Sequence, residues 1–367
     1  MKSKKIIHLI TTIERGGAEK QLLTLVREQV KFGLGVEIFY LKGAPELKHE
    51  FENCGATVNK ILLKKSFIQQ IITLRKKLNQ DQTPVHAHLP KSELLASLSC
   101  PKGMFIFTRH NSEPFWPGAP KILSNLLSKF VAKRSAFGVC ISNAVRDYVI
   151  QRGELSKEYD LKTIYYGFEK IEQLDAKALA EIKDQLIVKP GVLRIGSIGR
   201  LVRQKDYPTL LSAMRQVIDS GIDAELFIVG EGVEKENLIE LTLELGINER
   251  VHWLGRTPFV NEFISQLDLF VLPSIYEGFG LVLLEAMQAN KPIVATNNSS
   301  IPEVLGKDYA GLFETSNVEK LSGLIRKVLL EDALAKQLVS NYAIRLADFT
   351  SEVMAEKLLR VYEKSGF

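Results

Sequence analysis

The sequence predicts an α/β protein made of two doubly wound parallel sheets that face a central cleft. Short apolar runs alternate with helix-period amphipathic runs in the first half, and the same alternation restarts in the second half. The length of 367 residues also exceeds the roughly 250–300 residues at which single cores stop growing. Pro190-Gly191 follows a charged stretch and has the composition of a linker. We therefore expect one domain in residues 1–190 and a second in residues 191–350.

Strands in the first domain are expected where apolar runs occur, and helices where apolar residues recur every three or four positions. The expected strands are residues 6–10, 36–41, 56–61, 85–88, 104–110, 137–141 and 163–167. The expected helices begin at Gln21 and cover residues 64–80, 119–134 and 144–151, the last with Ser142 as N-cap.

The second domain is expected to repeat this order. Its strands are residues 192–198, 224–229, 251–254, 269–272 and 293–295. Its helices are residues 207–220, 235–245, 259–266 and 281–290, followed by helical residues 316–346 and a last helix at 351–363. Ligands of such sheets bind outside the carboxyl ends of the strands. The loops at Gly16-Gly17, Gly199–Lys205 and Gly278–Gly280 would lie there.

The composition is that of an ordinary globular protein, with 46% apolar and 25% charged residues. Three widely separated cysteines without a Cys-x-x-Cys spacing indicate a reducing, cytoplasmic setting and no zinc site. The first apolar run is too short for a signal peptide, and no stretch has the 18 or so apolar residues of a membrane span.

Charge is divided unequally along the chain. Residues 1–190 hold 30 Lys and Arg against 19 Asp and Glu, a formal charge of +11, whereas the remainder carries −6. This division indicates that the first half meets an anionic partner. A nucleic acid is not favoured, because basic and aromatic residues are not interleaved.

The turn after residues 269–272 is the most informative motif. Glu277 stands in a glycine-containing turn and Glu285 lies about one helical turn inside the helix that starts at Leu281. A helix N-terminus offers unpaired N–H groups to anions, and carboxylates accept hydrogen bonds from hydroxyls. Either Glu alone would suit the helix dipole, but the pair around Gly278 and Gly280 favours one ligand that reaches over the turn.

Cationic side chains occur in the loop that leaves residues 192–198. Arg200 and Lys205 suit a diphosphate, since arginine binds two oxygens at once and lysine supplies a point charge. Arg203 is interpreted as a solvated charge. Gly16-Gly17 precedes a helix and would allow a phosphate to approach the backbone.

Histidine 110 ends a predicted strand, where an imidazole can bind a sugar hydroxyl or carry a proton. His86 and His88 are weaker candidates in a similar location. The sequence has no Walker P-loop, no Gly-x-Gly-x-x-Gly at either first turn and no Asp-X-Asp triplet that would hold a metal ion beside a diphosphate. We therefore expect no metal and no cofactor.

With these motifs, the chain resembles glycosyltransferase family 4, retaining enzymes of the GT-B fold, from about residue 5 to the end. The matching segments are Gly16-Gly-Ala-Glu19, Gly199-Arg-Leu-Val-Arg-Gln-Lys205 and Glu277-Gly-Phe-Gly-Leu-Val-Leu-Leu-Glu285, a Glu-x7-Glu motif. Thr108-Arg-His-Asn111 departs from the longer, glycine-containing histidine motif that is frequent in the family.

The resemblance implies a role for each matching residue. Arg200 and Lys205 would hold the donor diphosphate, Glu277 would lie by the donor sugar and Glu285 would bind the ribose. The remaining implied contacts are backbone groups of Phe279, Gly280 and Leu281 with the sugar, Gly16 and Gly17 with the diphosphate, and His110 with the transferred sugar. The last helix, residues 351–367, would pack back onto the first domain.

These expectations describe a cytoplasmic, metal-independent, retaining hexosyltransferase. It would move a hexose or N-acetylhexosamine from a nucleotide sugar, UDP-linked, to a lipid-linked glycan acceptor in the biosynthesis of lipopolysaccharide or capsule. The basic helices 64–80 and 119–134 would contact the anionic inner face of the membrane peripherally; alternatively, they pack their apolar faces on the sheet. A nucleotide-sugar epimerase or phosphorylase of the same fold, and a sugar-nucleotide-binding protein without catalysis, are the alternative functions.

Overall fold

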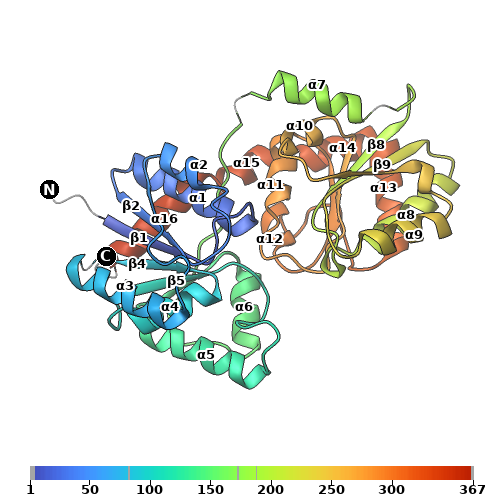
Figure 1. Ribbon diagram of the computed structural model, residues 1–367. Helices are drawn as coiled ribbons and strands as arrows, with labels where there is room; N and C mark the ends of the chain where they lie inside the picture. Colours follow the sequence, from blue (N-terminus) through green and yellow to red (C-terminus); the bar gives the residue numbers. More distant parts are fainter. Residues whose placement is uncertain (1–4, 82, 172, 187, 365–367) are drawn as a thin grey trace. The chain divides into compact units, whose positions relative to one another are not determined.

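A computed structural model describes residues 5–81, 83–171, 173–186 and 188–364. The chain divides into two compact units. The N-terminal unit contains Met1–Glu169 and Phe349–Phe367, and the C-terminal unit contains Lys170–Asp348. Each unit has its own parallel sheet with helices on both faces (Figure 1). The prediction of two doubly wound α/β domains is confirmed.

The N-terminal sheet has seven strands in the order β3-β2-β1-β4-β5-β6-β7, and every pairing is parallel. The strands are β1 (Lys5–Ile10), β2 (Gly35–Tyr40), β3 (Thr57–Asn59), β4 (Val85–His88), β5 (Phe105–Arg109), β6 (Gly138–Cys140) and β7 (Leu161–Thr163). All residues of β4 and β5 are buried, as expected of central strands covered on both faces.

Helices cover the two faces of this sheet in two groups. The helix α1 contacts α2 and α16 on one side, while α3, α4 and α5 contact one another in sequence on the other (Figure 1). Right-handed crossovers explain the grouping, because the chain changes direction along the sheet between β3 and β4. The helices are α1 (Gly17–Lys31), α2 (Lys48–Asn53), α3 (Phe67–Asp81), α4 (Pro90–Ser99), α5 (Lys121–Arg134), α6 (Asn143–Gln151) and α16 (Ser351–Lys364).

The C-terminal sheet has six parallel strands in the order β10-β9-β8-β11-β12-β13. These are β8 (Leu193–Ile198), β9 (Ala224–Val229), β10 (Val251–Gly255), β11 (Leu269–Leu272), β12 (Ile293–Thr296) and β13 (Leu312–Phe313). The helices are α7 (Ala176–Gln185), α8 (Tyr207–Asp219), α9 (Lys235–Glu244), α10 (Val260–Ser265), α11 (Leu281–Gln288), α12 (Ile301–Leu305), α13 (Val318–Leu330), α14 (Asp332–Val339) and α15 (Tyr342–Ala347), with 3₁₀ turns at Arg203–Lys205 and Asn248–Arg250.

Side chains of α8 and α13 pack on one face of this sheet and form an apolar cluster with it. Its most deeply buried members include Ile195, Leu210, Met214, Leu226, Val271, Leu321 and Ile325. They recur with helical spacing on α8 and α13 and with alternating spacing on β8 and β9, which is the pattern that predicted these elements.

Several elements were not predicted. The short helices α2 and α12 and the two-residue strand β13 are too brief to show a period. The helix α4 was missed because it is buried on most sides and begins with Pro90 directly after β4. The helix α7 was missed because it lies in the charged stretch that was assigned to the approach to a linker. Ser142 was predicted correctly as an N-cap, since its side chain accepts a hydrogen bond from the Val145 backbone N–H at 3.1 Å.

The boundary between the units differs from the expected one at residue 190. Residues 170–190 belong to the C-terminal unit, and they contain the helix α7. Asp175 caps α7 through the backbone N–H groups of Lys177 and Ala178, and its own N–H donates to Glu262 on α10 at 3.1 Å. The linker signal at Pro190-Gly191 therefore marks the turn between α7 and β8.

The last helix belongs to the N-terminal unit. Phe168 and Thr350 form an isolated parallel bridge, with the Phe168 N–H donating to the Phe349 carbonyl at 2.8 Å. A Cβ at Gly167 would lie 2.7 Å from the Ser351 Cα, so this crossing of two chain segments requires glycine. From here α16 runs along α1.

Candidate active site

Strand order reverses at one point in each sheet: between β1 and β4, and between β8 and β11. Ligands of doubly wound sheets bind at such switch points, outside the carboxyl ends of the strands. The predicted residues Gly16 and Gly17 follow β1, Arg200 and Lys205 follow β8, and Glu277 follows β11. The structure therefore places three of these four loops at a switch point, and the fourth, which carries His110, one strand away, after β5.

The switch point of the C-terminal unit joins the two predicted loops through one ion pair. The Lys205 Nζ lies 2.5 Å from the Glu277 Oε1, and their side chains are only 14% and 9% exposed. The Ser274 hydroxyl donates to the same carboxylate oxygen at 2.6 Å. A cation and a carboxylate are thus held together with little water around them, where their fields are strong.

Gln204 connects Arg200 to the glutamate turn. Gln204 accepts a hydrogen bond from the Ile275 N–H through its carbonyl and donates through its side chain to the Tyr276 carbonyl, both at 2.8 Å. The exposed Arg200 guanidinium donates to the Gln204 side-chain oxygen at 3.3 Å. The basic loop and the glutamate turn are therefore one connected structure.

Hydroxyl residues after β12 hold the glutamate turn from the other side. The Ser299 and Ser300 hydroxyls donate to the Glu277 carbonyl at 2.6 and 3.0 Å, and Thr296 donates to the Ser274 carbonyl at 2.6 Å. None of these three hydroxyl residues was predicted as part of the site. The available signal was the polar stretch of residues 296–300 at the end of a predicted strand.

Helix α11 begins at Leu281 directly after this turn. Gly280 is its N-cap at φ +82°, a left-handed conformation that favours glycine, and Phe279 is buried. The first N–H groups of the helix point back over the turn and favour an anion. Glu285 lies on the same helix and is half-buried.

Two glycines that follow β9 lie directly against the backbone of the basic loop. A Cβ at Gly230, after β9, would lie 1.9 Å from the Gly199 carbonyl oxygen, and Gly230 also has φ +154°. A Cβ at Gly232 would lie 2.2 Å from the Leu201 carbonyl oxygen. Only glycines let this turn pack directly on the backbone of the loop that carries Arg200.

In the N-terminal unit, α1 begins at Gly17 with Gly16 as its N-cap, four residues before the expected start. The Glu19 side chain folds over Gly16, since a Cβ there would lie 2.3 Å from the Glu19 Oε2. Thr12 donates to the other oxygen at 2.6 Å. Glu19, which the sequence analysis quoted only as part of a motif, is thus a buried carboxylate at the β1 switch point.

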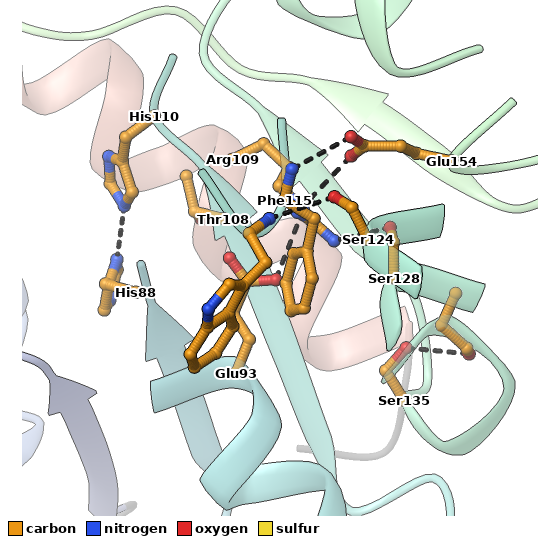
Figure 2. Close-up of polar contacts among 12 residues, drawn as sticks. His88, Glu93, Thr108, Arg109, His110, Phe115, Ser124, Ser128, Ser135 and Glu154 are labelled. Atoms are coloured by element: carbon orange, nitrogen blue, oxygen red, sulfur yellow. Dashed lines mark hydrogen bonds and ion pairs between the residues drawn. The ribbon is translucent and has the colours of Figure 1, made fainter. Parts of the chain in front are cut away.

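Histidine 110 is engaged on both ring nitrogens. Its Nε2 lies 3.1 Å from the His88 Nδ1 (Figure 2). Its Nδ1 is hydrogen-bonded to the Tyr166 hydroxyl. Burial and then the charge of Arg109 lower the pKa of His110 from 6.5 to about 3, so the imidazole is neutral. These three side chains line a cavity of about 20 Å³, room for roughly one water molecule.

His86 and His88, the weaker candidates, are buried next to His8, and these three form the one cluster of potential metal ligands among the described residues. Their ring nitrogens already have partners. His8 contacts His88 and Gln29, while His86 contacts Thr108 and Tyr362. We interpret the cluster as a hydrogen-bond network.

A buried charge cluster lies on the opposite face of β5 (Figure 2). The Arg109 Nε is 3.2 Å from the Glu93 Oε2, its NH1 is 3.8 Å from the Glu154 Oε2, and its NH2 donates to the Ser128 hydroxyl at 2.9 Å. The Phe115 ring stacks on the guanidinium at 4.3 Å, and the Phe115 N–H donates to Glu154 at 2.9 Å. The cluster thereby fixes the loop that follows His110.

Two protein families match this chain, one over each half. The family described as Glycosyltransferase Family 4 matches residues 15–168, and the family described as Glycosyl transferases group 1 matches residues 180–344. The capsular polysaccharide biosynthesis glycosyltransferase CapM of Staphylococcus aureus is 25% identical over 99% of this chain and 97% of that protein.

A second relative is matched over a shorter region. The N-acetylgalactosamine-N,N'-diacetylbacillosaminyl-diphospho-undecaprenol 4-alpha-N-acetylgalactosaminyltransferase of Campylobacter jejuni is 29% identical over 54% of this chain and 52% of that protein. Several further curated relatives are matched over 45% to 66% of their own length.

Among solved structures, HepE of Anabaena in complex with UDP and glucose superposes with a TM-score of 0.84 at 18% identity, over 98% of this chain and 100% of that chain. At this identity the likeness shows the fold. Together with the two family matches, it shows that the chain is a glycosyltransferase of the family 4 type and adopts the GT-B fold.

Proposed function

We propose that this protein is a retaining hexosyltransferase. It moves a hexose or N-acetylhexosamine from a UDP-linked sugar to a lipid-linked glycan acceptor in the biosynthesis of a surface polysaccharide. One observation carries the proposal: the Lys205–Glu277 pair, with Arg200 beside it, lies at the β8–β11 switch point. The N-terminus of α11 follows in the same turn.

The reaction breaks the bond between the sugar C1 and the diphosphate oxygen and forms a bond between C1 and an acceptor oxygen. The acceptor hydroxyl loses a proton, and a nucleoside diphosphate leaves with additional negative charge. Arg200 and Lys205 stabilise that charge, and preorganised cations are effective because they need no reorientation during the reaction. When Lys205 turns to the diphosphate, the Glu277 carboxylate becomes an acceptor for sugar hydroxyls, and Glu285 binds the ribose.

Two lines of support favour a UDP-sugar without a metal. HepE, which shares the fold, has been solved in complex with UDP-glucose as well as with UDP and glucose. The two cations supply the charge that a divalent ion would otherwise provide, and the sequence has no Asp-X-Asp triplet. Retention of the anomeric configuration is expected from the resemblance to the family.

The acceptor proposal rests on the relatives and on the charge of the N-terminal unit. The Campylobacter relative is named for a diphospho-undecaprenol acceptor and the Staphylococcus relative for capsular polysaccharide. A lipid-linked acceptor brings the enzyme to a membrane surface. We therefore propose a cytoplasmic protein whose first domain contacts the anionic inner leaflet peripherally.

Helix α5 gives this membrane contact a specific surface. Its buried face carries small side chains, including the fully buried Ser124 and Ser128. The Ser124 hydroxyl accepts a hydrogen bond from the Trp116 N–H, and the Ser128 hydroxyl accepts one from Arg109. Val131 is also buried, but four large apolar side chains are exposed. We call these residues the α5 outer face: Ile122 (77% exposed), Leu123, Leu126 and Phe130. The alternative, in which the apolar face packs on the sheet, accounts for Val131 and leaves the α5 outer face without a partner among the described residues.

The positive charge of α5 favours an anionic bilayer as the partner of the α5 outer face. Lys121, Lys129 and Lys133 are exposed on α5, which contains no acidic residue. Each basic residue near an anionic leaflet contributes roughly 1 kcal/mol. Apolar Ile68 and Ile72 are also exposed on α3. In the described part of the chain, no helix has both the length and the hydrophobicity needed to cross a bilayer.

Vesicle sedimentation tests the surface. We expect the protein to pellet with anionic vesicles at low salt and to be released at high salt, because the screening length falls with ionic strength. Ile122→Glu combined with Leu126→Glu should abolish pelleting. The matched control is Ile344→Glu on α15, at a residue that is 72% exposed in the C-terminal unit and should have no effect. Equal pelleting with neutral vesicles, or an equal loss in the control, contradicts this proposal.

A thermal-shift screen over nucleotides and nucleotide sugars tests the donor proposal. A ligand at 100 times its Kd stabilises the folded state by about 2.7 kcal/mol. We expect UDP and UDP-sugars to raise the Tm more than GDP or ADP compounds, and Lys205→Ala to remove the shift. Stabilisation by a donor that is never consumed would indicate a binding protein without catalysis, and a changed sugar without an acceptor would indicate an epimerase.

A further inference from the structure

Hydrogen bonds connect His110 to the interior of the N-terminal unit through a chain of buried side chains. Beyond the contact of His110 with His88, the His88 Nε2 lies 2.9 Å from the His8 Nδ1. The His8 Nε2 lies 2.8 Å from the Gln29 side-chain oxygen. At the other end of this series of hydrogen bonds, the Tyr166 hydroxyl is hydrogen-bonded to the His110 Nδ1. His8, His88 and Gln29 are at most 2% exposed, so water does not interrupt the chain.

The register of the sheet produces this arrangement. His8 on β1 is paired with His86 on β4, and His88 is paired with Thr108 on β5, the residue two before His110. Residues two apart on a strand point to the same face, so His88 and His110 both lie on the α1 face of the sheet with His8. Gln29 reaches them from α1.

Gln29 fixes which group donates and which accepts along this series of hydrogen bonds. Its amide nitrogen donates to the Tyr362 hydroxyl at 3.3 Å, so its oxygen is turned toward His8. An amide oxygen only accepts, so the His8 Nε2 carries a proton. A neutral imidazole has one N–H, and the His8 Nδ1 is then an acceptor that requires a proton on the His88 Nε2.

The same logic continues to the end of the chain. The His88 Nδ1 is unprotonated and accepts from the His110 Nε2–H. The His110 Nδ1 is in turn unprotonated and accepts from the Tyr166 hydroxyl. At every contact, the group nearer Tyr166 donates and the group nearer Gln29 accepts.

A second series of hydrogen bonds, which branches from Gln29, has a compatible order of donors and acceptors. Tyr362 accepts from Gln29 and donates to the His86 Nδ1 at 2.7 Å, and the His86 Nε2 then donates to the Thr108 hydroxyl at 2.7 Å. All four histidines, including His8 and His110, therefore carry their proton on Nε2.

Burial keeps the imidazoles neutral, and this donor–acceptor order requires neutral rings. Desolvation is the largest cause that lowers the pKa of each imidazole: to about 4 for His8, and well below 6.5 for His86 and His88. An imidazolium donates from both nitrogens and would reverse one neighbour. With neutral rings the direction set at Gln29 reaches His110 unchanged.

We infer that Gln29 is a positioning residue for His110: acting through His8 and His88, it keeps the proton of His110 on Nε2 and leaves Nδ1 as a hydrogen-bond acceptor. This rests on the proposed function, together with the contact of His110 with the transferred sugar that the resemblance to the family implies. An acceptor at Nδ1 suits a sugar hydroxyl, which then donates its proton in place of the Tyr166 hydroxyl. Gln29 lies on α1, whereas His110 follows β5, and Gln29 does not itself touch the sugar.

NMR of protein labelled with ¹⁵N-histidine tests the inference directly, through long-range couplings that distinguish Nδ1–H from Nε2–H. We expect the Nε2–H form for His8, His86, His88 and His110. Gln29→Met keeps the length of the side chain but removes the oxygen that accepts from His8, so His8 and His110 should show both tautomers.

The matched control is Gln70→Met. Gln70 is also 2% exposed in the same unit, but its amide bonds to the carbonyls of Leu41 and Leu62, away from the histidines. It should leave every tautomer unchanged. Tyr362→Phe, which removes only a hydroxyl, keeps the test informative if Gln29→Met fails to fold, because it also releases the Gln29 amide. An Nδ1–H form of His110 in the wild type overturns the inference, as do variants whose His110 tautomer does not change.

Kinetics separate positioning from structural damage. If the two tautomers of His110 become equally populated in Gln29→Met, only half of the molecules present an acceptor at Nδ1, and the apparent kcat/KM for the donor falls about twofold. An unchanged kcat/KM in a variant whose tautomers are mixed contradicts the assignment. The NMR result needs no substrate, so a failure of the proposed function would leave the tautomer test intact.

Discussion

Replacing Glu93 by Gln should change how the stability of the N-terminal unit depends on pH. Glu93 lies on α4, is fully buried, and neither of its oxygens has a hydrogen-bond partner among the described residues. Its ion pair with Arg109 is shared, because Glu154 contacts the same guanidinium. A buried carboxylate that one cation must share is poorly compensated.

The pKa of Glu93 is raised from 4.5 to about 7, mainly by desolvation, against the attraction of Arg109 and with a further increase from Glu154. The folded protein therefore holds this proton more tightly than the unfolded chain. Stability is highest when Glu93 is protonated, and it is lost as the pH rises from about 4.5 through about 7. A shift of this size corresponds to about 3 kcal/mol.

Glutamine mimics the protonated carboxyl and does not titrate. We expect Glu93→Gln to match the wild type near pH 4.5 and to be more stable above pH 7 by about 3 kcal/mol. Urea unfolding at several pH values measures this, with Trp116 as the fluorescent reporter of the N-terminal unit in a Trp253→Phe background. Parallel pH profiles, or a variant that is less stable than the wild type at pH 8, would refute the reasoning.

Three further predictions concern the C-terminal unit. Lys205→Ala and Arg200→Ala should each lower turnover by about 10²–10³-fold without changing the circular dichroism spectrum, because each removes a preorganised cation; near-normal rates in both variants would reject their role. Excess chelator should leave the rate unchanged, and a rate that collapses and returns with Mg²⁺ or Mn²⁺ would show that a metal is needed. Gly230→Ala should weaken donor binding in calorimetry and lower the Tm, because its Cβ would lie 1.9 Å from the Gly199 carbonyl oxygen; unchanged affinity would show that the basic loop tolerates displacement.

The sequence was sufficient for the two sheets and for the glutamate turn, since both depend on local patterns. Strands such as β9 are continuous apolar runs, and Gly280 marks the turn into α11 by its own conformation. The Lys205–Glu277 contact was accessible in outline, because the ends of neighbouring parallel strands lie at one edge. The hydroxyls of Ser299 and Ser300 were not, because their partner is a backbone carbonyl that no pattern identifies.

Other features depended on long-range contacts. The amphipathic pattern of α5 left open whether its apolar face is buried, and Ser128 faces inward because the buried Arg109 needs a partner. The sequence singled out His110 from its place at a strand end, but only the register of β1, β4 and β5 joins it to His8 through His88. The linker signal at residue 190 competed with the packing of α7 on α10, and the packing prevailed.

Transfer of sugar from a labelled UDP-sugar to a lipid-linked acceptor tests the central claim most directly. We predict that UDP is released only when the acceptor is present, that the product keeps the anomeric configuration of the donor by NMR, and that Lys205→Ala abolishes the reaction. A protein that binds UDP-sugars but forms no glycosylated product with any acceptor, or a product of inverted configuration, would contradict the account.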